Sequence, residues 1–433
     1  MSSRWGMPQD YFSNATAAVG TYNYRHLGQV CFMMRFAEFF AGVGLVREGL
    51  ARNGWSCAWA NDIAQDKQET YTANFGEGDF VLGDIWQIAQ QPEQIPDDVF
   101  LYTASFPCTD LSVAGGMAGL AGEKSGTLNA LLNILAQKKQ ANTQPKIVLL
   151  ENVKGFLTSH QGQDISNTVK ALNALGYTVD IIELDAVLFT PQSRPRIFVI
   201  AVENLLAQHV MQLKQNAPDS WWAPFHQAPQ LRSHTVQDLI QNNPDLNWGL
   251  FDIPEPERTA PKLSHIVEHI PENSPLWWGA EKQQHLYDQM SPRHQTVVRE
   301  KLNQPEHFYG TVYRRMRKGQ PMAELRSDGI AGCLRTPRGG SSKQILVRAG
   351  HGGWKARLLT PREYARLQGV RDSFWMPDNA NKGYFAMGDA VCVPVIQYLS
   401  KHVLKPAYGA WREIQQTAID EVARHMAAMG AVR

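Results

Sequence analysis

The sequence predicts an α/β fold, with a doubly wound, mainly parallel sheet and a second, smaller domain. Between residues 31 and 202, short apolar runs bounded by turn residues alternate with amphipathic stretches. Such alternation is typical of parallel strands connected by helices that cover both faces of the sheet. Beyond Glu203 the pattern changes to a stretch rich in proline, tryptophan and histidine with little periodicity, which predicts the second domain.

Apolar runs predict the strands of the sheet at residues 33–40, 57–59, 99–103, 147–150 and 197–202. Amphipathic periodicity predicts helices between them, including residues 45–53 and 165–175, which end before Gly54 and Gly176. Glycine commonly follows the last helical residue because it adopts a left-handed conformation without steric penalty. In a doubly wound sheet, ligands bind beyond the carboxyl ends of the strands, so functional residues are expected there.

The changes of pattern also divide the chain. We expect an extension over residues 1–30, a first domain over 31–204, a second domain over 205–383, and a segment over 384–433 that returns to the first domain. This last segment regains a helical pattern at residues 397–404. We therefore expect a two-domain globular protein whose chain crosses back to the first domain.

Composition argues against secretion and membrane insertion. The chain has 433 residues, 43% of them apolar, yet no stretch approaches the roughly 18 consecutive apolar residues of a spanning helix. Its five cysteines include no Cys-x-x-Cys pair, and none lies beside histidines at metal-binding spacing. We therefore expect a protein of the reducing cytoplasm with no bound metal.

Charge is unevenly distributed along the chain, although the formal net charge is only +1 at pH 7. Between Tyr313 and Arg371 the sequence has fourteen lysines and arginines and only three acidic residues. A solvated surface normally intersperses both signs. A one-sided cluster of this size favours a surface that contacts phosphates.

A candidate ligand site follows the first predicted strand, where Gly42 and Gly44 precede a helix. Glycines at such a turn let the backbone approach a ligand closely. A dinucleotide fingerprint would have a third glycine where this chain has Arg47, so a nucleoside ligand fits better. Asp62 and Asp84 end the next two predicted strands and are suited to ribose hydroxyls and an adenine amino group. Each acid alone is as readily explained by a helix cap, but together they predict an adenosine site.

Cys108 follows the predicted strand at residues 99–103 and is the candidate nucleophile. Most cysteines are small buried hydrophobic residues, so position alone is a weak argument. Here Pro107 stiffens the preceding chain, and five glycines between residues 115 and 126 predict a mobile lid. A thiolate at the end of a buried strand is suited to covalent catalysis.

Glu151 follows the predicted strand at residues 147–150, while Arg194 and Arg196 precede the strand at 197–202. On a doubly wound sheet these groups lie at the same edge as Cys108. A surface strand end and an ordinary ion pair are the alternative interpretations. An acid and two guanidiniums beside a nucleophile are better explained by a polarised substrate ring and a bound phosphate.

In this order, the segments resemble the motifs of the DNA cytosine-5 methyltransferase family of the prokaryotic restriction-modification type. The resemblance covers residues 36–400 except the middle stretch. It rests on Phe40-Ala-Gly-Val-Gly44, Phe106-Pro-Cys-Thr109, Glu151-Asn-Val153, Gln192-x-Arg194-x-Arg196, the region from Arg335 to Lys343 with Thr360-Pro-Arg-Glu363, and Met387-Gly-Asp-Ala-Val391. It implies a Rossmann-like, S-adenosylmethionine-dependent catalytic domain followed by a smaller DNA-binding, target-recognition domain.

By this resemblance, Cys108 attacks carbon 6 of a cytosine that has left the duplex, while Glu151 binds N3 and the amino group of the ring. Arg196 lies near the base and Arg194 supports the site. The residues implied for S-adenosylmethionine are Phe40, Gly42, Gly44, Asp62, Ile63, Asp84, Ile85, Pro107, Asp389 and Val391, and those implied for DNA are Ser112, Arg335, Arg338 and Lys343. Asp389 departs from the family pattern, which typically has asparagine at this position.

The resemblance implies a monomeric enzyme that acts on double-stranded DNA, and it allows a cognate restriction endonuclease in the same host. The middle stretch, residues 205–326, is implied to recognise the target sequence. A tRNA cytosine methyltransferase shares the catalytic motifs, but this chain has no Cys-Phe-Thr in the middle stretch. A nicotinamide-dependent oxidoreductase is disfavoured by the missing third glycine, and a catalytically silent DNA-binding relative by the intact Cys108 and Glu151.

Overall fold

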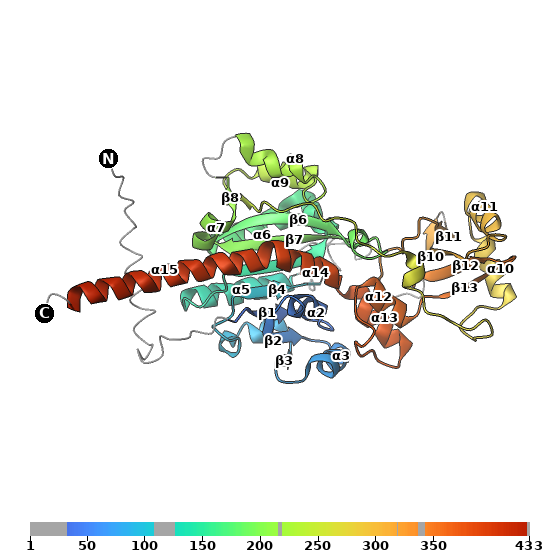
Figure 1. The fold of residues 1–433 in the computed structure, drawn as a ribbon, viewed down its shortest axis with the longest axis horizontal. Helices are drawn as coiled ribbons and strands as arrows, with labels where there is room; N and C mark the ends of the chain where they lie inside the picture. Colours follow the sequence, from blue (N-terminus) through green and yellow to red (C-terminus); the bar gives the residue numbers. More distant parts are fainter. Residues whose placement is uncertain (1–32, 108–125, 215–218, 318, 337–342, 431–433) are drawn as a thin grey trace.

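A computed structural model describes residues 33–107, 126–214, 219–317, 319–336 and 343–430. The described chain forms a large sheet domain, a smaller sheet domain beside it, and a long C-terminal helix (Figure 1). Three residues singled out from the sequence, Cys108, Ser112 and Arg338, lie outside the described ranges.

The large domain is built on a seven-stranded sheet with the order β3-β2-β1-β4-β5-β7-β6. Its strands are β1 (Arg35–Phe39), β2 (Ser56–Asp62), β3 (Phe80–Leu82), β4 (Leu101–Ala104), β5 (Ile147–Val153), β6 (Tyr177–Asp185) and β7 (Pro195–Glu203). All neighbours pair in parallel except β7, which runs antiparallel to both β5 and β6. The predicted mainly parallel sheet is therefore confirmed, with β6 as a strand that the apolar runs did not indicate.

Helices cover both faces of this sheet, because side chains of successive strand residues point to opposite faces. In β1, Ala37 and Phe39 belong to one apolar core and Phe36 to the other. The first core includes residues of α4 (Ile85–Ile88), α5 (Thr127–Gln140) and α6 (Gln163–Ala174), and the second includes residues of α2 (Leu45–Ala51) and α7 (Asn204–Val210). The remaining helix of this half, α3 (Gln65–Phe75), follows β2 and packs its Tyr71 against Phe80.

Residues 211–253 also pack on the large sheet. They form β8 (Gln212–Leu213), α8 (Ala223–Gln227), α9 (His234–Asn242) and β9 (Gly249–Leu250). Trp248, Leu250 and one face of α9 lie in the first core of the large domain, whereas Phe251 and Ile253 lie in the second. This packing supports a proposed domain boundary near residue 254, about fifty residues after the expected one at 204.

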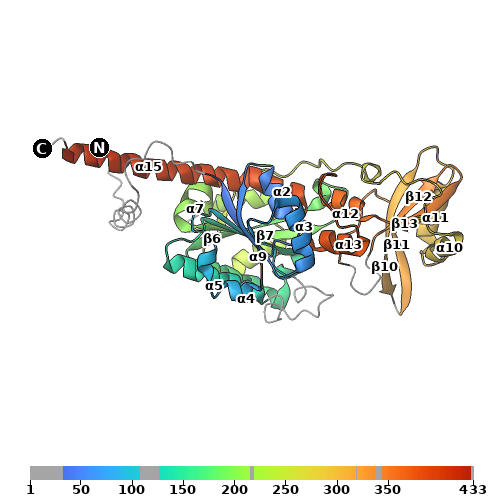
Figure 2. The same ribbon diagram turned by 90° about the horizontal axis from the view of Figure 1, so that it is seen from below.

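The small domain contains a four-stranded antiparallel sheet with the order β11-β10-β12-β13. Its elements are α10 (Ala280–Asp288), α11 (Pro292–Lys301), β10 (Phe308–Arg317), β11 (Gln320–Arg326), β12 (Ile345–Gly350) and β13 (Gly353–Leu358). Two helices, α12 (Pro361–Leu367) and α13 (Ala380–Asp389), lie between the two sheets (Figures 1 and 2). They share an apolar cluster with Val43 and Leu45 of the large domain and with Leu334 of the small one.

The C-terminal segment packs on the large domain. It comprises α14 (Val393–Leu399), a π-helical turn (Ser400–Leu404) and α15 (Lys405–Gly430), so the expected helix at 397–404 lies within a longer helical stretch. Residues of α14 and the first turns of α15 belong to the second core. The rest of α15 extends beyond the large domain (Figures 1 and 2). Among the described helices, none is both long enough and apolar enough to cross a membrane.

Candidate active site

The candidate site lies at the carboxyl ends of β1, β2, β4 and β5. β1 pairs with β2 on one side and with β4 on the other, so the order of strands reverses at β1. The loops that leave the sheet on either side of such a reversal diverge and create a crevice, which is where ligands bind in doubly wound sheets. The residues that follow these four strands therefore share one edge.

The loop after β1 adopts left-handed backbone conformations at three positions. Phe40, Gly42 and Gly44 have φ angles of 54°, 59° and 81°. Asp62, at the end of β2, fixes this loop: one carboxylate oxygen accepts from the Gly42 amide at 2.8 Å and the other from the Ala64 amide at 2.9 Å. Asp62 was expected to bind ribose hydroxyls; in the structure its carboxylate anchors the glycine loop.

The two glycines have different surroundings. A Cβ on Gly42 would meet no atom within 4 Å, whereas a Cβ on Gly44 would lie 2.5 Å from the ring of Phe75. Gly44 is therefore required for packing against α3. Gly42 instead borders open space, so a ligand can approach its backbone directly.

Exposed apolar side chains and carboxylates lie together at the ends of β2 and β3. Ile63 is 68% exposed, and Leu82 and Trp86 are also exposed, which is unusual for apolar residues at adjacent strand ends. Asp84 accepts a hydrogen bond from the Trp86 amide at 3.0 Å through one oxygen. Apolar surface for a flat base and carboxylates for hydroxyl or amino groups together suit the adenosine half of S-adenosylmethionine.

The other residues expected to bind the cofactor differ in their exposure to solvent. Ile85 and Val391 are both 4% exposed, and their side chains lie in the first and the second core of the large domain, respectively. Asp389 is exposed at the end of α13 and lies close enough to Arg194 to act on its pKa. The unusual acid therefore faces the arginine cluster described below.

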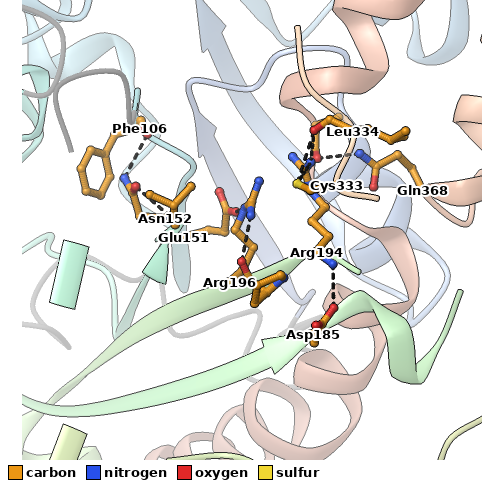
Figure 3. Close-up of polar contacts among 12 residues, drawn as sticks. Phe106, Glu151, Asn152, Asp185, Arg194, Arg196, Cys333, Leu334 and Gln368 are labelled. Atoms are coloured by element: carbon orange, nitrogen blue, oxygen red, sulfur yellow. Dashed lines mark hydrogen bonds and ion pairs between the residues drawn. The ribbon is translucent and has the colours of Figure 1, made fainter. Parts of the chain in front are cut away.

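Glu151 and Arg196 form an ion pair between β5 and β7. Nε of Arg196 lies 3.0 Å from Oε1 of Glu151, and both side chains are largely buried (Figure 3). The antiparallel register pairs Arg196 with Val153, two residues from Glu151, so the contact runs along the same face. The sequence predicted that these two residues lie at one edge, and the structure brings them into direct contact.

Asn152 ties this edge to the segment that precedes Cys108. Its Nδ2 donates to the carbonyl of Phe106 at 3.2 Å, and both residues are buried (Figure 3). Pro107 follows, and with it the described part of this segment ends. The sequence motif Glu151-Asn-Val153 thus holds both the acid and the chain leading to the predicted nucleophile. No feature of the sequence itself assigned this role to Asn152.

Arg194 points away from Glu151 and toward the chain between β11 and β12 (Figure 3). It is 2% exposed and donates to the carbonyls of Leu334 at 2.9 Å and Gly388 at 3.2 Å. Burial and the neighbouring Arg196 lower the pKa of its guanidinium. Arg194 therefore binds backbone carbonyls of other segments, whereas Arg196 pairs with the carboxylate of Glu151.

Cys333 is a residue of this neighbourhood that sequence analysis did not single out. Its Sγ lies 3.5 Å from Nη1 of Arg194. Burial opposes ionisation of the thiol, but the guanidiniums of Arg194 and Arg196 outweigh it and lower the pKa of Cys333. Cys333 lies 139 positions after Arg194 in the sequence, and only the return of the chain from the small domain brings the two side chains together.

Two basic residues of the segment between Tyr313 and Arg371 were expected to contact DNA and are described in the structure. Arg335 is exposed and lies next to the Arg194 and Cys333 cluster, where it helps to lower the pKa of Cys333. Lys343 donates to Asn381 at 2.7 Å and lies 4.6 Å from the ring centre of Tyr384. Both remain expected DNA contacts. Within the described ranges, no cluster of histidine, cysteine and acidic side chains is arranged to hold a metal ion.

The fold and the site together define a class. The strand order with β7 antiparallel, the left-handed glycine loop after β1 and the acids after β2 and β3 are those of a Rossmann-like, S-adenosylmethionine-dependent methyltransferase. Within that class, the C-5 cytosine-specific DNA methylase family matches residues 34–405. The chain belongs to this family, and it methylates carbon 5 of cytosine in DNA with S-adenosylmethionine as the methyl donor.

Similar proteins agree with this assignment over nearly their full lengths. The chain is 29% identical over 379 residues to type II methyltransferase M.Bsp6I of Bacillus sp., covering 86% of this chain and 99% of the relative. It is 27% identical over 375 residues to type II methyltransferase M.HhaI of Haemophilus parahaemolyticus, covering 86% and 94%. The crystal structure of the S. pombe Dnmt2 methyltransferase has the same fold, with a TM-score of 0.56 at 19% identity over 86% of this chain and 99% of that one.

Proposed function

We propose that Cys108, Glu151 and Arg196 carry out the reaction on a cytosine that has been rotated out of the DNA duplex. The contact between Glu151 and Arg196 at 3.0 Å carries this proposal, because it places an oriented acid at the edge where Phe106 and Pro107 lead into Cys108. Cytosine is aromatic and does not react with an electrophilic methyl group unaided. Covalent addition replaces one difficult substitution with easier steps.

The first step is addition of the Cys108 thiolate to carbon 6 of the ring. The new carbon–sulfur bond displaces the electron pair of the 5,6 double bond, and carbon 5 becomes nucleophilic. Glu151 binds N3 and the exocyclic amino group and stabilises the charge that addition creates. Arg196 holds the carboxylate of Glu151 in one orientation, so little reorganisation is needed at the moment of reaction.

S-adenosylmethionine, when bound, supplies a methyl group on a sulfonium, which is the electrophile for carbon 5. Residues of this chain would hold it through the backbone at Gly42, the carboxylates of Asp62 and Asp84, and the apolar surface of Ile63. After transfer, a base removes the proton from carbon 5. The electron pair then reforms the double bond and expels the Cys108 thiolate.

The small domain is proposed as the target-recognition domain. Arg335 and Lys343 lie between it and the catalytic edge, and arginines of β10 add to the charge of its sheet. The type II methyltransferases M.Bsp6I and M.HhaI support a role in a restriction-modification system, with a cognate restriction endonuclease as the partner activity. We further propose that the chain acts as a monomer in the cytoplasm, where DNA is accessible.

The covalent step is tested with duplex DNA that contains 5-fluorocytosine in place of cytosine. Fluorine cannot leave as a proton, so the wild-type protein with S-adenosylmethionine should form an adduct that survives denaturing electrophoresis. Cys108→Ala should form none. Cys57→Ala is the matched control, because Cys57 lies near the opposite end of β2, and it should form the adduct normally. An adduct with Cys108→Ala, or methylation by wild type without any adduct on fluorinated DNA, would contradict the proposal.

A further inference from the structure

Three buried polar side chains, Gln192, Arg194 and Gln368, lie where the two sheet domains meet. Gln192 and Gln368 are 0% exposed and Arg194 is 2% exposed. Uncharged glutamine and charged arginine are both costly to bury unless their hydrogen bonds are satisfied. Their partners therefore show what these residues hold together.

Gln192 connects the loop before β7 to the small domain and to α12. Its Oε1 accepts from the Leu334 amide at 3.2 Å, and its Nε2 donates to the Leu367 carbonyl at 2.9 Å. Backbone bonds reinforce the first connection: Ser193 donates to the Ala331 carbonyl at 2.9 Å, and Ala331 donates to the Pro191 carbonyl at 2.7 Å. The loop and the small domain are thus joined by one isolated parallel bridge between Gln192 and Ala331.

Gln368 extends the connection to the end of α13. Its Nε2 donates to the carbonyls of Met387 at 2.7 Å and Ala390 at 3.0 Å, and its Oε1 lies 3.3 Å from Nε2 of Gln192. Arg194 closes the arrangement with its bonds to the Leu334 and Gly388 carbonyls. A Cβ on Gly388 would lie 2.6 Å from the carbonyl carbon of Arg335, so these two segments are in direct contact.

We propose that Gln192, Arg194 and Gln368 form a positioning node that fixes the small domain, and the DNA it contacts, relative to the catalytic edge. The node holds residues 331–335, which connect β11 to the chain leading into β12. The apolar cluster shared by α12 and α13 also joins the domains, but apolar packing is not directional. The hydrogen bonds of the three buried side chains are directional and favour one arrangement of the two domains. Arg194 therefore acts through Leu334 and Gly388 and not on the cytosine.

This inference rests on the proposed function, since it assumes that DNA contacts both domains. If the node sets the arrangement of the two domains, a weakened node leaves them less ordered. Part of the free energy of DNA binding is then used to order them. The expected result is a higher KM for DNA and a lower kcat, because the base is presented less accurately to Glu151. Binding of S-adenosylmethionine should change less than DNA binding. Gly42, Asp62 and Asp84 lie at the ends of β1, β2 and β3, whereas only Asp389 and Val391 adjoin Gly388 and Ala390, whose carbonyls the node binds.

The test compares Arg194→Lys and Gln368→Ala with a matched buried arginine. Lysine keeps the charge but cannot bridge two carbonyls as a planar fork does. Arg232→Lys is the control: Arg232 is 2% exposed and bonds Asp180 and the Phe251 carbonyl, all within the large domain. All three variants should lower the unfolding temperature. Only the two node variants should lose about tenfold or more in kcat/KM for DNA.

Cofactor affinity, measured by calorimetry, should fall by less than kcat/KM for DNA in every variant that remains folded, since most of the expected cofactor residues lie on the loops after β1, β2 and β3. Node variants that lose stability but keep the KM and kcat of the control would overturn the inference and leave the proposed function intact. A loss of cofactor affinity as large as the loss in kcat/KM for DNA would also overturn the inference. Failure of the wild-type protein to methylate any DNA would instead refute the proposed function.

Discussion

Replacement of Glu38 by glutamine should make the protein more resistant to unfolding in alkaline solution. Glu38 lies in β1, two residues before Phe40 and the glycine loop, and is 1% exposed. Within the described chain neither of its carboxyl oxygens makes a hydrogen bond of normal geometry. Burial raises its pKa to about 8, although the guanidinium and backbone amide of Arg47 oppose the shift.

The sign and size of the effect follow from this pKa. Between the ordinary value of 4.5 and about 8, the folded protein keeps the proton on Glu38 while the unfolded chain releases it. Stability therefore falls as the pH rises through this window. At about 1.36 kcal/mol for each pKa unit, the whole difference amounts to roughly 5 kcal/mol, of which about 2–3 kcal/mol is lost between pH 6 and pH 9.

The groups facing Glu38 set this environment. Arg47 comes from α2, Asp62 from β2 and Asp79 from the chain before β3, and the two acids raise the pKa of Glu38 further. Arg47 is itself bound to Asp79 at 2.7 Å and to the Tyr71 hydroxyl at 2.8 Å. Its charge is therefore shared, and Glu38 is expected to remain neutral at physiological pH.

Urea unfolding of wild type and Glu38→Gln at pH 6 and pH 9 measures the effect. The difference in unfolding free energy should move in favour of the variant by about 2–3 kcal/mol as the pH rises, and other titrating groups cancel in the comparison. Glu48→Gln is the control, because Glu48 is buried but paired with Arg52 at 2.9 Å and should lose stability at both pH values. A difference between wild type and Glu38→Gln that does not change with pH would refute the reasoning.

Three further predictions concern catalysis, DNA binding and the cofactor loop. Glu151→Gln should keep DNA affinity but lose about 10²–10⁴ in kcat, because the group that stabilises the ring is gone; single-turnover methylation shows this, and unchanged kcat would argue against its role. Arg335→Met should reduce the slope of log affinity against log salt concentration by about 1, measured by fluorescence anisotropy, whereas an unaltered slope would exclude a phosphate contact. Gly44→Ala should lower the free energy of unfolding by about 1–3 kcal/mol, because Gly44 has φ of 81° and its Cβ would meet Phe75. Gly42→Ala, which meets no atom, should weaken cofactor binding with a smaller loss of stability; equal melting temperatures for the two would contradict the distinction.

The sheet and the placement of most site residues could be predicted from sequence because they depend on local pattern. Apolar runs gave the strand positions, and the rule that ligands bind at carboxyl ends placed Gly42, Asp62, Asp84 and Glu151 at one edge. Strand β6 was not predicted because Asp180 and Glu183 interrupt its apolar run. Both acids are buried against partners that are distant in the sequence. Periodicity alone cannot reveal such compensation.

Contacts between segments that are far apart in the sequence could not be predicted from the sequence. Gln192 and Gln368 are 176 positions apart, and no spacing rule connects them. Cys333 looked like any other cysteine until the structure placed it beside Arg194. Residues 211–253 were assigned to the second domain because their composition changes, yet their apolar side chains fill the cores of the first. Composition identifies a change of pattern, whereas packing decides to which domain a segment belongs.

The central claim is that this chain methylates carbon 5 of cytosine in DNA through Cys108 and the edge formed by Glu151 and Arg196. Bisulfite sequencing of DNA from cells that express the wild-type chain or Cys108→Ala tests it most directly. We expect protected cytosines at one recurring sequence with the wild-type chain and none with Cys108→Ala. Protection that is absent from wild-type cells, or equally present with Cys108→Ala, would contradict it.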